Sequence, residues 1–97
     1  MRIVSRKTLR DFYGKHNDAK TPLEVWFQET IEARWSGPRD IKARYPSADI
    51  LPDNRIVFNI KGNAYRLIVK IHYNTGIVFI RFIGTHAQYD RIDATTV

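Results

Sequence analysis

The side chains able to do chemistry in this 97-residue chain concentrate in its second half. Between Asp53 and Asp90 there is no acidic residue, yet the segment carries cationic side chains and two histidines: Arg55, Lys61, Arg66, Lys70, Arg81, His72 and His86. A surface with so many cations repels itself unless an anion neutralises it. The segment is therefore predicted to bind a polyanion through its phosphate groups.

A second group of polar side chains follows at residues 84–90, with the sequence GTHAQYD. Thr85 and Gln88 have capping-box spacing, so this segment is predicted to close a strand and open a helix. His86 then lies in the first helical turn, and Tyr89 and Asp90 lie three and four residues on, near the same face. An imidazole there could accept a proton and Tyr89 could assist, although either side chain could instead be a surface or packing residue.

Several kinds of site cannot be assembled from this sequence. The chain has no cysteine, which excludes a disulfide framework, a thiolate nucleophile and the usual cysteine-containing zinc sites. We find no paired carboxylates, no cluster of metal ligands, no Ser-His-Asp pattern and no phosphate-binding glycine loop. A metal-dependent nuclease is disfavoured, because such a site needs several carboxylates, and no cofactor is expected.

RNA supplies what such a basic site lacks, because each scissile phosphate has a 2′-hydroxyl beside it as a nucleophile. Cleavage then needs a base for the hydroxyl proton, cations for the phosphorane charge and an acid for the leaving oxygen. Arginine, lysine, histidine and tyrosine are sufficient for this, whereas DNA lacks the hydroxyl. The residues therefore favour a metal-independent ribonuclease.

Helices are predicted in the first half of the chain. The first is indicated by residues at helical spacing and should end near Asn17: Leu9, Phe12, Tyr13 and His16. Thr21-Pro22 begins the second, whose apolar stripe comprises Leu23, Trp26, Phe27, Ile31 and Trp35. Gly37-Pro38 should end it, residues 2–5 are β-prone, a helical turn is plausible at 39–44 and a loop is expected at 46–54.

Three strands are predicted at about 55–61, 64–73 and 77–84, separated by turns at Gly62-Asn63 and Thr75-Gly76. Two-residue turns would pair Phe58 with Leu67, Ile60 with Tyr65, Val69 with Phe82 and Ile71 with Ile80 on an apolar face. The other face would pair Asn59 with Arg66 and Lys70 with Arg81. Like charges directly opposite each other destabilise a strand pair, so the last pair suggests a functional role, although both side chains could simply extend into solvent.

These elements predict a single α+β domain over residues 1–97. N-terminal helices pack on the apolar face of a small antiparallel sheet, a short C-terminal helix follows, and the opposite, cationic face binds RNA. The core would bring Trp26, Phe27, Ile31 and Trp35 against Leu67, Val69, Ile71, Ile80 and Phe82. The net charge of +6 suits a nucleic-acid binder. A signal core and a run of 18 apolar residues are absent, so we expect an intracellular, cytoplasmic protein without a membrane partner.

The runs VFNIKGNAYRLIVKIHY at 57–73 and FIRFIGTHAQYDRIDA at 79–94 resemble the HigB toxins of bacterial toxin–antitoxin modules, within the RelE-like group. The resemblance covers nearly the whole chain, including the two helices before the sheet. It implies an mRNA endonuclease that arrests translation, in many members on the ribosome. It also implies a helix-turn-helix antitoxin, HigA, as partner.

Residue by residue, the resemblance implies that Arg66, Arg81, His86 and Tyr89 are the catalytic residues. Asn59, Lys61, Asn63 and Lys70 would contact RNA. In this scheme Arg66 and Arg81 stabilise the phosphorane, His86 or Lys70 takes the 2′-hydroxyl proton, and Tyr89 acts as acid or orienting donor. The neutral tail after Asp93 differs from the basic extension of some relatives, which leaves the base and the ribosome dependence open.

Two other functions remain open on the sequence. One is a non-catalytic RNA-binding module that stacks bases on Tyr65, Tyr73 or Phe79. The other is a gyrase-directed toxin of the ParE type, since one fold can carry different activities.

Overall fold

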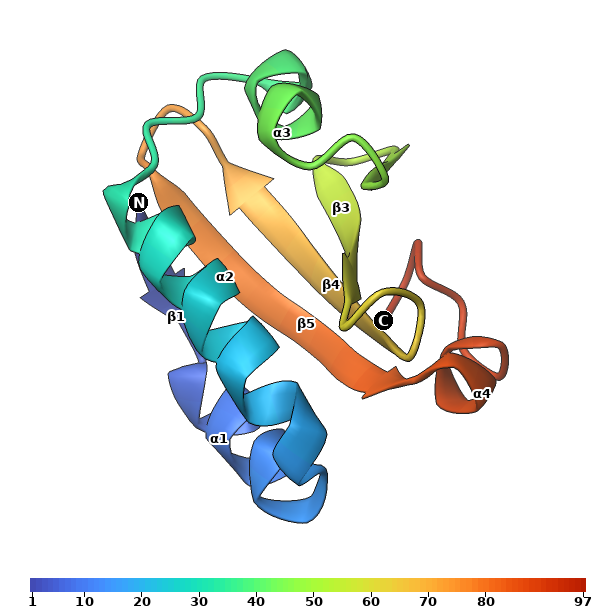
Figure 1. The fold of residues 1–97 in the computed structure, drawn as a ribbon. Helices are drawn as coiled ribbons and strands as arrows, with labels where there is room; N and C mark the ends of the chain where they lie inside the picture. Colours follow the sequence, from blue (N-terminus) through green and yellow to red (C-terminus); the bar gives the residue numbers. More distant parts are fainter.

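Five strands form one sheet in the order β1-β5-β4-β3-β2 (Figure 1). They are β1 (Arg2–Val4), β2 (Asp49–Leu51), β3 (Arg55–Ile60), β4 (Tyr65–His72) and β5 (Ile77–Thr85). The computed structural model describes residues 1–97. The fold is α+β, as predicted, but the sheet is mixed rather than purely antiparallel, because the first strand pairs in parallel with β5.

Four helices accompany the sheet: α1 (Arg6–Lys15), α2 (Lys20–Glu32), α3 (Pro38–Arg44) and α4 (His86–Tyr89), with a 3-10 turn, η1 (Asn17–Ala19), before α2. The predicted helices are thus confirmed. The second is shorter than expected, because Ala33 adopts an extended backbone with ψ of 156°. Trp35 therefore reaches the core from the connection that follows α2, not from the helix.

The core lies between the sheet and the α1–α2 pair (Figure 1). Trp26 of α2 and Trp35 both contact Phe58 of β3, with ring centres 5.4 Å and 6.2 Å away. Two members of the predicted core lie elsewhere. Ile31 is 40% exposed, and Phe82 lies on the opposite side of the sheet, where Ile83 takes its place against the core.

The first hairpin has the predicted register: Phe58 pairs with Leu67, Ile60 with Tyr65 and Asn59 with Arg66. The prediction for the second hairpin is wrong. His72 pairs with Ile77, so the turn spans four residues, and Val69 pairs with Ile80 rather than Phe82. Lys70 consequently pairs with Phe79, and the predicted Lys70–Arg81 pair does not form.

A β-bulge at Arg81 shifts the register within β5. Val69 pairs with Ile80 and Ile68 with Phe82, which leaves Arg81 without a partner on β4. Such an extra residue reverses which side chains of a strand face the core. For this reason Phe79 and Phe82, three residues apart, lie on the same side of the sheet.

The short strand β2 replaces part of the loop expected at 46–54. Asp49–Leu51 pairs with the outer edge of β3, so that Ile50 lies opposite Ile56. Three residues are too few for a period-two pattern, and the strand forms because β3 offers it an unpaired edge.

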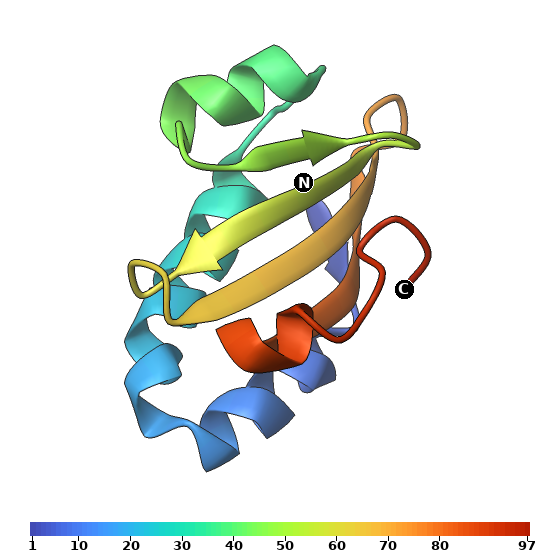
Figure 2. The same cartoon turned by 90° about the vertical axis from the view of Figure 1, so that its right-hand side faces the viewer.

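The side of the sheet opposite α1 and α2 is called here the open face. Its residues are Arg55, Val57, Asn59, Arg66, Ile68, Lys70, His72, Phe79 and Phe82. The short helix α4 and the C-terminal segment 90–97 lie on this side (Figure 2). Arg55 is only 5% exposed there, and its Nη1 donates to the main-chain oxygens of Ala94, at 3.4 Å, and Val97.

Candidate nucleic-acid interface

The helix α4 is anchored at one end of the open face by the predicted capping box, which is confirmed. The main-chain N–H of Gln88 donates to Thr85 Oγ1 at 3.2 Å, and the main-chain N–H of Thr85 donates to Gln88 Oε1 at 2.9 Å. The His86 amide also donates to the carbonyl of Ala64, in the β3–β4 turn, at 3.2 Å. These bonds fix the first turn of α4 against the hairpin that carries Arg66.

Arg66 and Tyr89 meet at this end. The guanidinium carbon of Arg66 lies 5.3 Å from the centre of the Tyr89 ring, within range of a cation–π interaction. Both side chains are partly buried, and the Nε of Arg66 is buried without a partner. The ring holds the guanidinium in one orientation, and no carboxylate neutralises it.

His86 also lies near Tyr89, with its ring centre 6.5 Å from that of the tyrosine. Its Nδ1 is 3.1 Å from Oδ2 of Asp90, one helical turn on. This contact orients the imidazole, and Nε2 has no protein partner. The structure thus brings Arg66, His86 and Tyr89 together as one group, which we call the α4 cluster.

Arg81, the fourth predicted catalytic residue, is exposed on the β5 bulge. Its Nε donates to the main-chain oxygen of Val97 at 3.2 Å, and it forms no hydrogen bond or ion pair with the α4 cluster. Since the bulge removes Arg81 from the ladder, its guanidinium depends on the C-terminal segment for its position.

The two predicted RNA-binding lysines both form ion pairs. The ammonium of Lys70 lies 2.9 Å from the carboxylate of Asp53. The hydrogen bond from Lys70 and its positive charge hold the pKa of the Asp53 carboxyl below its ordinary value of 3.8. Lys61 turns toward the helical layer and lies 2.6 Å from Asp18. Carboxylates from outside residues 54–89 therefore compensate part of the positive charge of this segment. The absence of acidic residues within the segment had indicated that its charge was uncompensated.

The two asparagines predicted to contact RNA, Asn59 and Asn63, differ in their surroundings. Asn59 pairs with Arg66 across the strands, and its Nδ2 donates to the carbonyl of Ser47 at 3.2 Å. Its Oδ1 is buried without a partner. Asn63 is exposed in the β3–β4 turn.

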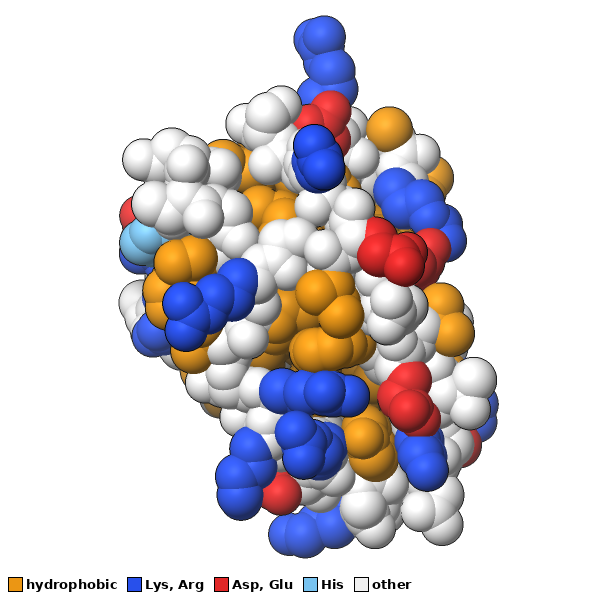
Figure 3. All heavy atoms as spheres, turned by 90° about the vertical axis from the view of Figure 1, so that its left-hand side faces the viewer, with side chains coloured by type: hydrophobic (Ala, Val, Ile, Leu, Met, Phe, Trp, Pro, Cys, Tyr) orange, Lys and Arg blue, Asp and Glu red, His pale blue; other side chains and the backbone are white.

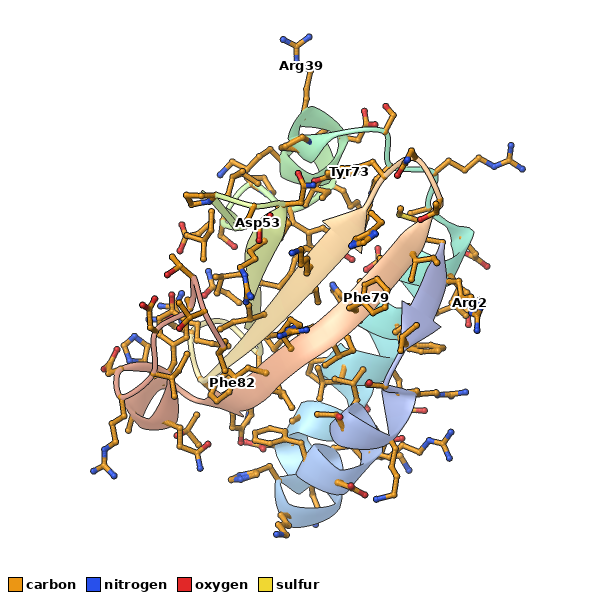
Figure 4. The ribbon with its side chains drawn as sticks, turned by 180° about the vertical axis from the view of Figure 1, so that it is seen from behind. Arg2, Arg39, Asp53, Tyr73, Phe79 and Phe82 are labelled. Carbon is orange, nitrogen blue, oxygen red and sulfur yellow. The ribbon has the colours of Figure 1, made fainter.

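Two of the three aromatic residues considered as stacking platforms do not lie on the open face. Tyr65 is 7% exposed and belongs to the core, where its hydroxyl donates to Asp18. Tyr73 packs against the core, and burial raises the pKa of its hydroxyl. Phe79 is partly exposed on the open face (Figure 4).

Sequence reasoning missed two neighbours of the α4 cluster. Phe82 was assigned to the core, but its ring lies over Gly84, where a Cβ atom would be 2.5 Å from the ring tip Cζ. Asp90 was noted only for its position in the helix, although it is the partner of His86. The four-residue His-to-Asp spacing was the available signal for that pair.

Positive charge also occurs on the helical layer (Figure 3). Lysines and arginines surround an apolar patch there, and a small hollow of about 90 Å³ lies between α1 and α2. Arg6 covers the ring of Phe27 at 4.3 Å from its centre. No histidine lines this hollow, so the open face is the better candidate for acid–base chemistry.

Two further features of the structure concern metal binding and membranes. No three His, Asp or Glu side chains are grouped so that they could hold a metal ion. None of the helices has the length and apolarity needed to span a bilayer.

A comparison with protein families matches residues 19–92 to the HigB toxins, described as the RelE-like toxic component of a toxin–antitoxin system. The chain belongs to the HigB toxin family. The matched range contains the α4 cluster, Arg81 and all four predicted RNA contacts. The family membership confirms the resemblance found in the sequence.

Curated HigB proteins align over most of this chain. The mRNA interferase toxin HigB of Escherichia coli strain K12 is 29% identical over 92 residues, 93% of this chain and 88% of that protein. The mRNA interferase HigB of Shigella flexneri has the same identity and coverage. The mRNA interferase HigB of E. coli O6:H1 is 23% identical over 94 residues, 95% of this chain and 91% of that protein.

Proposed function

We propose that this HigB-family toxin is an mRNA endoribonuclease that cleaves by metal-independent transesterification. The observation that carries the proposal is the α4 cluster, in which a free guanidinium, an oriented imidazole and a phenol meet on the open face. Each of these groups has a role in the attack of a 2′-hydroxyl on its own phosphate. The names of the related mRNA interferases support the same substrate.

In the proposed reaction His86 Nε2 takes the proton of the 2′-hydroxyl, and the oxygen attacks phosphorus. Arg66 stabilises the charge of the phosphorane, and Arg81 assists when the phosphate displaces the Val97 oxygen from it. The bond from phosphorus to the 5′-oxygen then breaks, and Tyr89 donates a proton to that leaving oxygen. The products are a 2′,3′-cyclic phosphate and a 5′-hydroxyl.

His86 is a better candidate for the base than Lys70. The Lys70 ammonium is paired with Asp53, and Lys70 lies four residues along β4 from Arg66. At about 3.3 Å per strand residue the two Cα atoms are about 13 Å apart, whereas His86 lies beside Tyr89 and Arg66 in the α4 cluster.

The proposal includes the cellular setting that the family suggests. The substrate is mRNA, with cleavage on the ribosome as the setting to be tested, and the compartment is the cytoplasm. The partner is an antitoxin of the HigA type with a helix-turn-helix fold. Membership of a toxin–antitoxin family supports an antitoxin partner.

The test is primer extension on a defined mRNA, with and without ribosomes, in the presence of a metal chelator. Wild-type protein should cut and leave 5′-hydroxyl ends, and a 2′-deoxyribose placed at a mapped cleavage site should abolish that cut. His86→Gln should reduce the rate about 10²- to 10⁴-fold, the usual contribution of a general base. His16→Gln, on the helical layer, should cleave at the wild-type rate.

Three results would contradict the proposal or its assignments. Cleavage of the deoxy-substituted RNA at that position would exclude transesterification. Full activity of folded Arg81→Ala would remove Arg81 from the mechanism. Folded wild-type protein that leaves mRNA intact would favour an RNA-binding module if it binds RNA, or a ParE-type toxin if it inhibits gyrase.

A further inference from the structure

A second group of side chains lies on the open face, away from the α4 cluster. Phe79 and His72 form an edge-to-face pair with ring centres 5.0 Å apart and an angle of 63°. Lys70 is directly opposite Phe79 on β4, and Val4 is opposite it on β1. Figure 4 shows Phe79 over the middle of the sheet, with Arg2 at the β1 edge.

This aromatic pair has no hydrogen-bonded link to the elements that lie on the open face. Apart from the capping box, the hydrogen bonds of α4 and of the C-terminal segment to the rest of the molecule go to Ala64, Arg55 and Arg81. Phe79 is partly exposed and His72 is exposed. The exposed ring surface of this pair is therefore open to a planar ligand group that would stack on it.

The surroundings of Phe79 identify the chemistry of that ligand. Lys70 lies on one side of Phe79 and Arg2 on the other; Lys70 is paired with the carboxylate of Asp53, and Arg2 forms no ion pair and leaves a net positive charge here. An open hollow of about 510 Å³ adjoins the pair, lined by Asp53, Asn54, Lys70, His72, Tyr73 and Asn74. Flat rings, cations and amides together suit a nucleotide, whose base stacks while its phosphate meets the cations.

We infer that Phe79 and His72 form a stacking site for a base of single-stranded RNA that flanks the cleaved phosphate. The inference rests on the proposed function for its substrate. Phe79 is opposite Lys70, and Lys70 is about 13 Å along β4 from Arg66, so different nucleotides of one strand meet the two groups. Because of the bulge at Arg81, Phe79 lies on the same side of the sheet as Gly84, the partner of Arg66.

The test measures binding separately from cleavage. Short RNAs with 2′-O-methyl groups throughout cannot undergo transesterification, and 2-aminopurine placed at each position in turn reports stacking through its quenched fluorescence. Wild-type protein should quench one position strongly. Phe79→Leu, which keeps the apolar volume but removes the ring, should abolish that quenching and raise the Kd about fivefold or more.

Two matched variants separate stacking from other effects of the substitution. Phe79→Tyr keeps a stacking ring and should bind like the wild type. Ile77→Val changes an aliphatic side chain on the same strand and face, and should also leave quenching and Kd unchanged. Thermal melts of all variants establish that they are folded.

The inference fails if Phe79→Leu binds the RNA and quenches 2-aminopurine as the wild type does, or if the folded wild type binds none of these RNAs. Failure of the proposed function looks different. In that case the wild type stacks one base through Phe79 but cuts no unmodified RNA, and His86→Gln leaves binding unchanged.

Discussion

Asp18 links two parts of the molecule that are far apart in sequence. Located in η1, it accepts hydrogen bonds from Lys61, at 2.6 Å, and from the Tyr65 hydroxyl. The Lys61 hydrogen bond, followed by that of Tyr65, lowers the pKa of Asp18 below 3.8, and the same contact with Asp18 raises the pKa of Tyr65 above 10.0. One carboxylate thus ties the helical layer to the β3–β4 hairpin.

The pH dependence of stability should reveal this link. Because folding lowers the pKa of Asp18, its charge stabilises the fold at pH values above the ordinary carboxyl pKa, and this stabilisation is lost as the pH falls below that value. Because folding raises the pKa of Tyr65, its neutral hydroxyl stabilises the fold at pH values below the ordinary tyrosine pKa, and this stabilisation is lost as the pH rises past that value. Asp18→Asn should therefore be less stable than wild type mainly between about pH 5 and 9.

Urea unfolding of Asp18→Asn and wild type across that range measures the effect. Asp11→Asn is the matched control, because Asp11 forms an exposed ion pair with Lys7 on one helix, a kind that contributes little. A constant difference between Asp18→Asn and wild type from pH 2 to 11 would show that the charge of Asp18 is irrelevant.

At the scale of elements, the sequence predicts what depends on local pattern. The three principal strands, the capping box at Thr85 and the first hairpin are correct, because alternation and turn residues specify them. The bulge at Arg81 was not predictable, because the sequence pattern does not show whether an extra residue lies within the strand or in the turn before it. Missing the bulge moved Phe82 to the wrong face, and assuming a two-residue turn where four residues form it created the false Lys70–Arg81 pair.

The candidate site was predictable to a similar extent. The capping-box spacing placed His86 and Tyr89 on one turn, and hairpin counting placed Arg66 opposite Asn59. The ion pairs of Lys61 with Asp18 and of Lys70 with Asp53 were missed, because each joins segments whose proximity only the folded sheet creates.

Gly84 of β5 lies next to the Phe82 ring and to the Gln88 side chain of α4. A Cβ atom there would lie 2.5 Å from the Phe82 ring and 2.8 Å from Gln88 Oε1. Gly84→Ala should therefore destabilise the protein by about 1–3 kcal/mol, the usual cost of overpacking. The Phe82→Leu change in the same chain should recover much of this loss by removing the ring.

Gly14 provides the opposite case for the same thermal unfolding measurement. A Cβ atom there would meet nothing within 4 Å, and the residue lies in α1. Gly14→Ala should stabilise the protein by about 0.5–1 kcal/mol. Equal stability of Gly84→Ala and wild type would mean that the Phe82 ring is not held over Gly84.

At the scale of the whole molecule, lysines and arginines lie on the helical layer as well as on the open face, and net charge alone does not show which one binds RNA. Salt dependence can distinguish them. Each phosphate contact to single-stranded RNA adds about 0.7 to the slope of log affinity against log salt concentration.

Lys70→Gln should lower that slope by about 0.7, because Lys70 lies on the open face beside Phe79. Lys20→Gln, an exposed change at the start of α2, should leave the slope unaltered. Titrations of a 2′-O-methyl RNA between 50 and 200 mM salt, as in the usual range for such measurements, would give both values. A lower slope only for Lys20→Gln would assign binding to the helical layer.

The pairing of β1 with β5 has a consequence for the order of events during synthesis. Residues 2–4 pair with residues 77–79, so β1 must wait until β5, the last strand of this sheet along the chain, has been made. Until then α1 and α2 have no complete apolar surface to pack on, and α4 does not yet exist. A growing chain therefore lacks its open face, and any activity on that face, until residue 89 has left the ribosome.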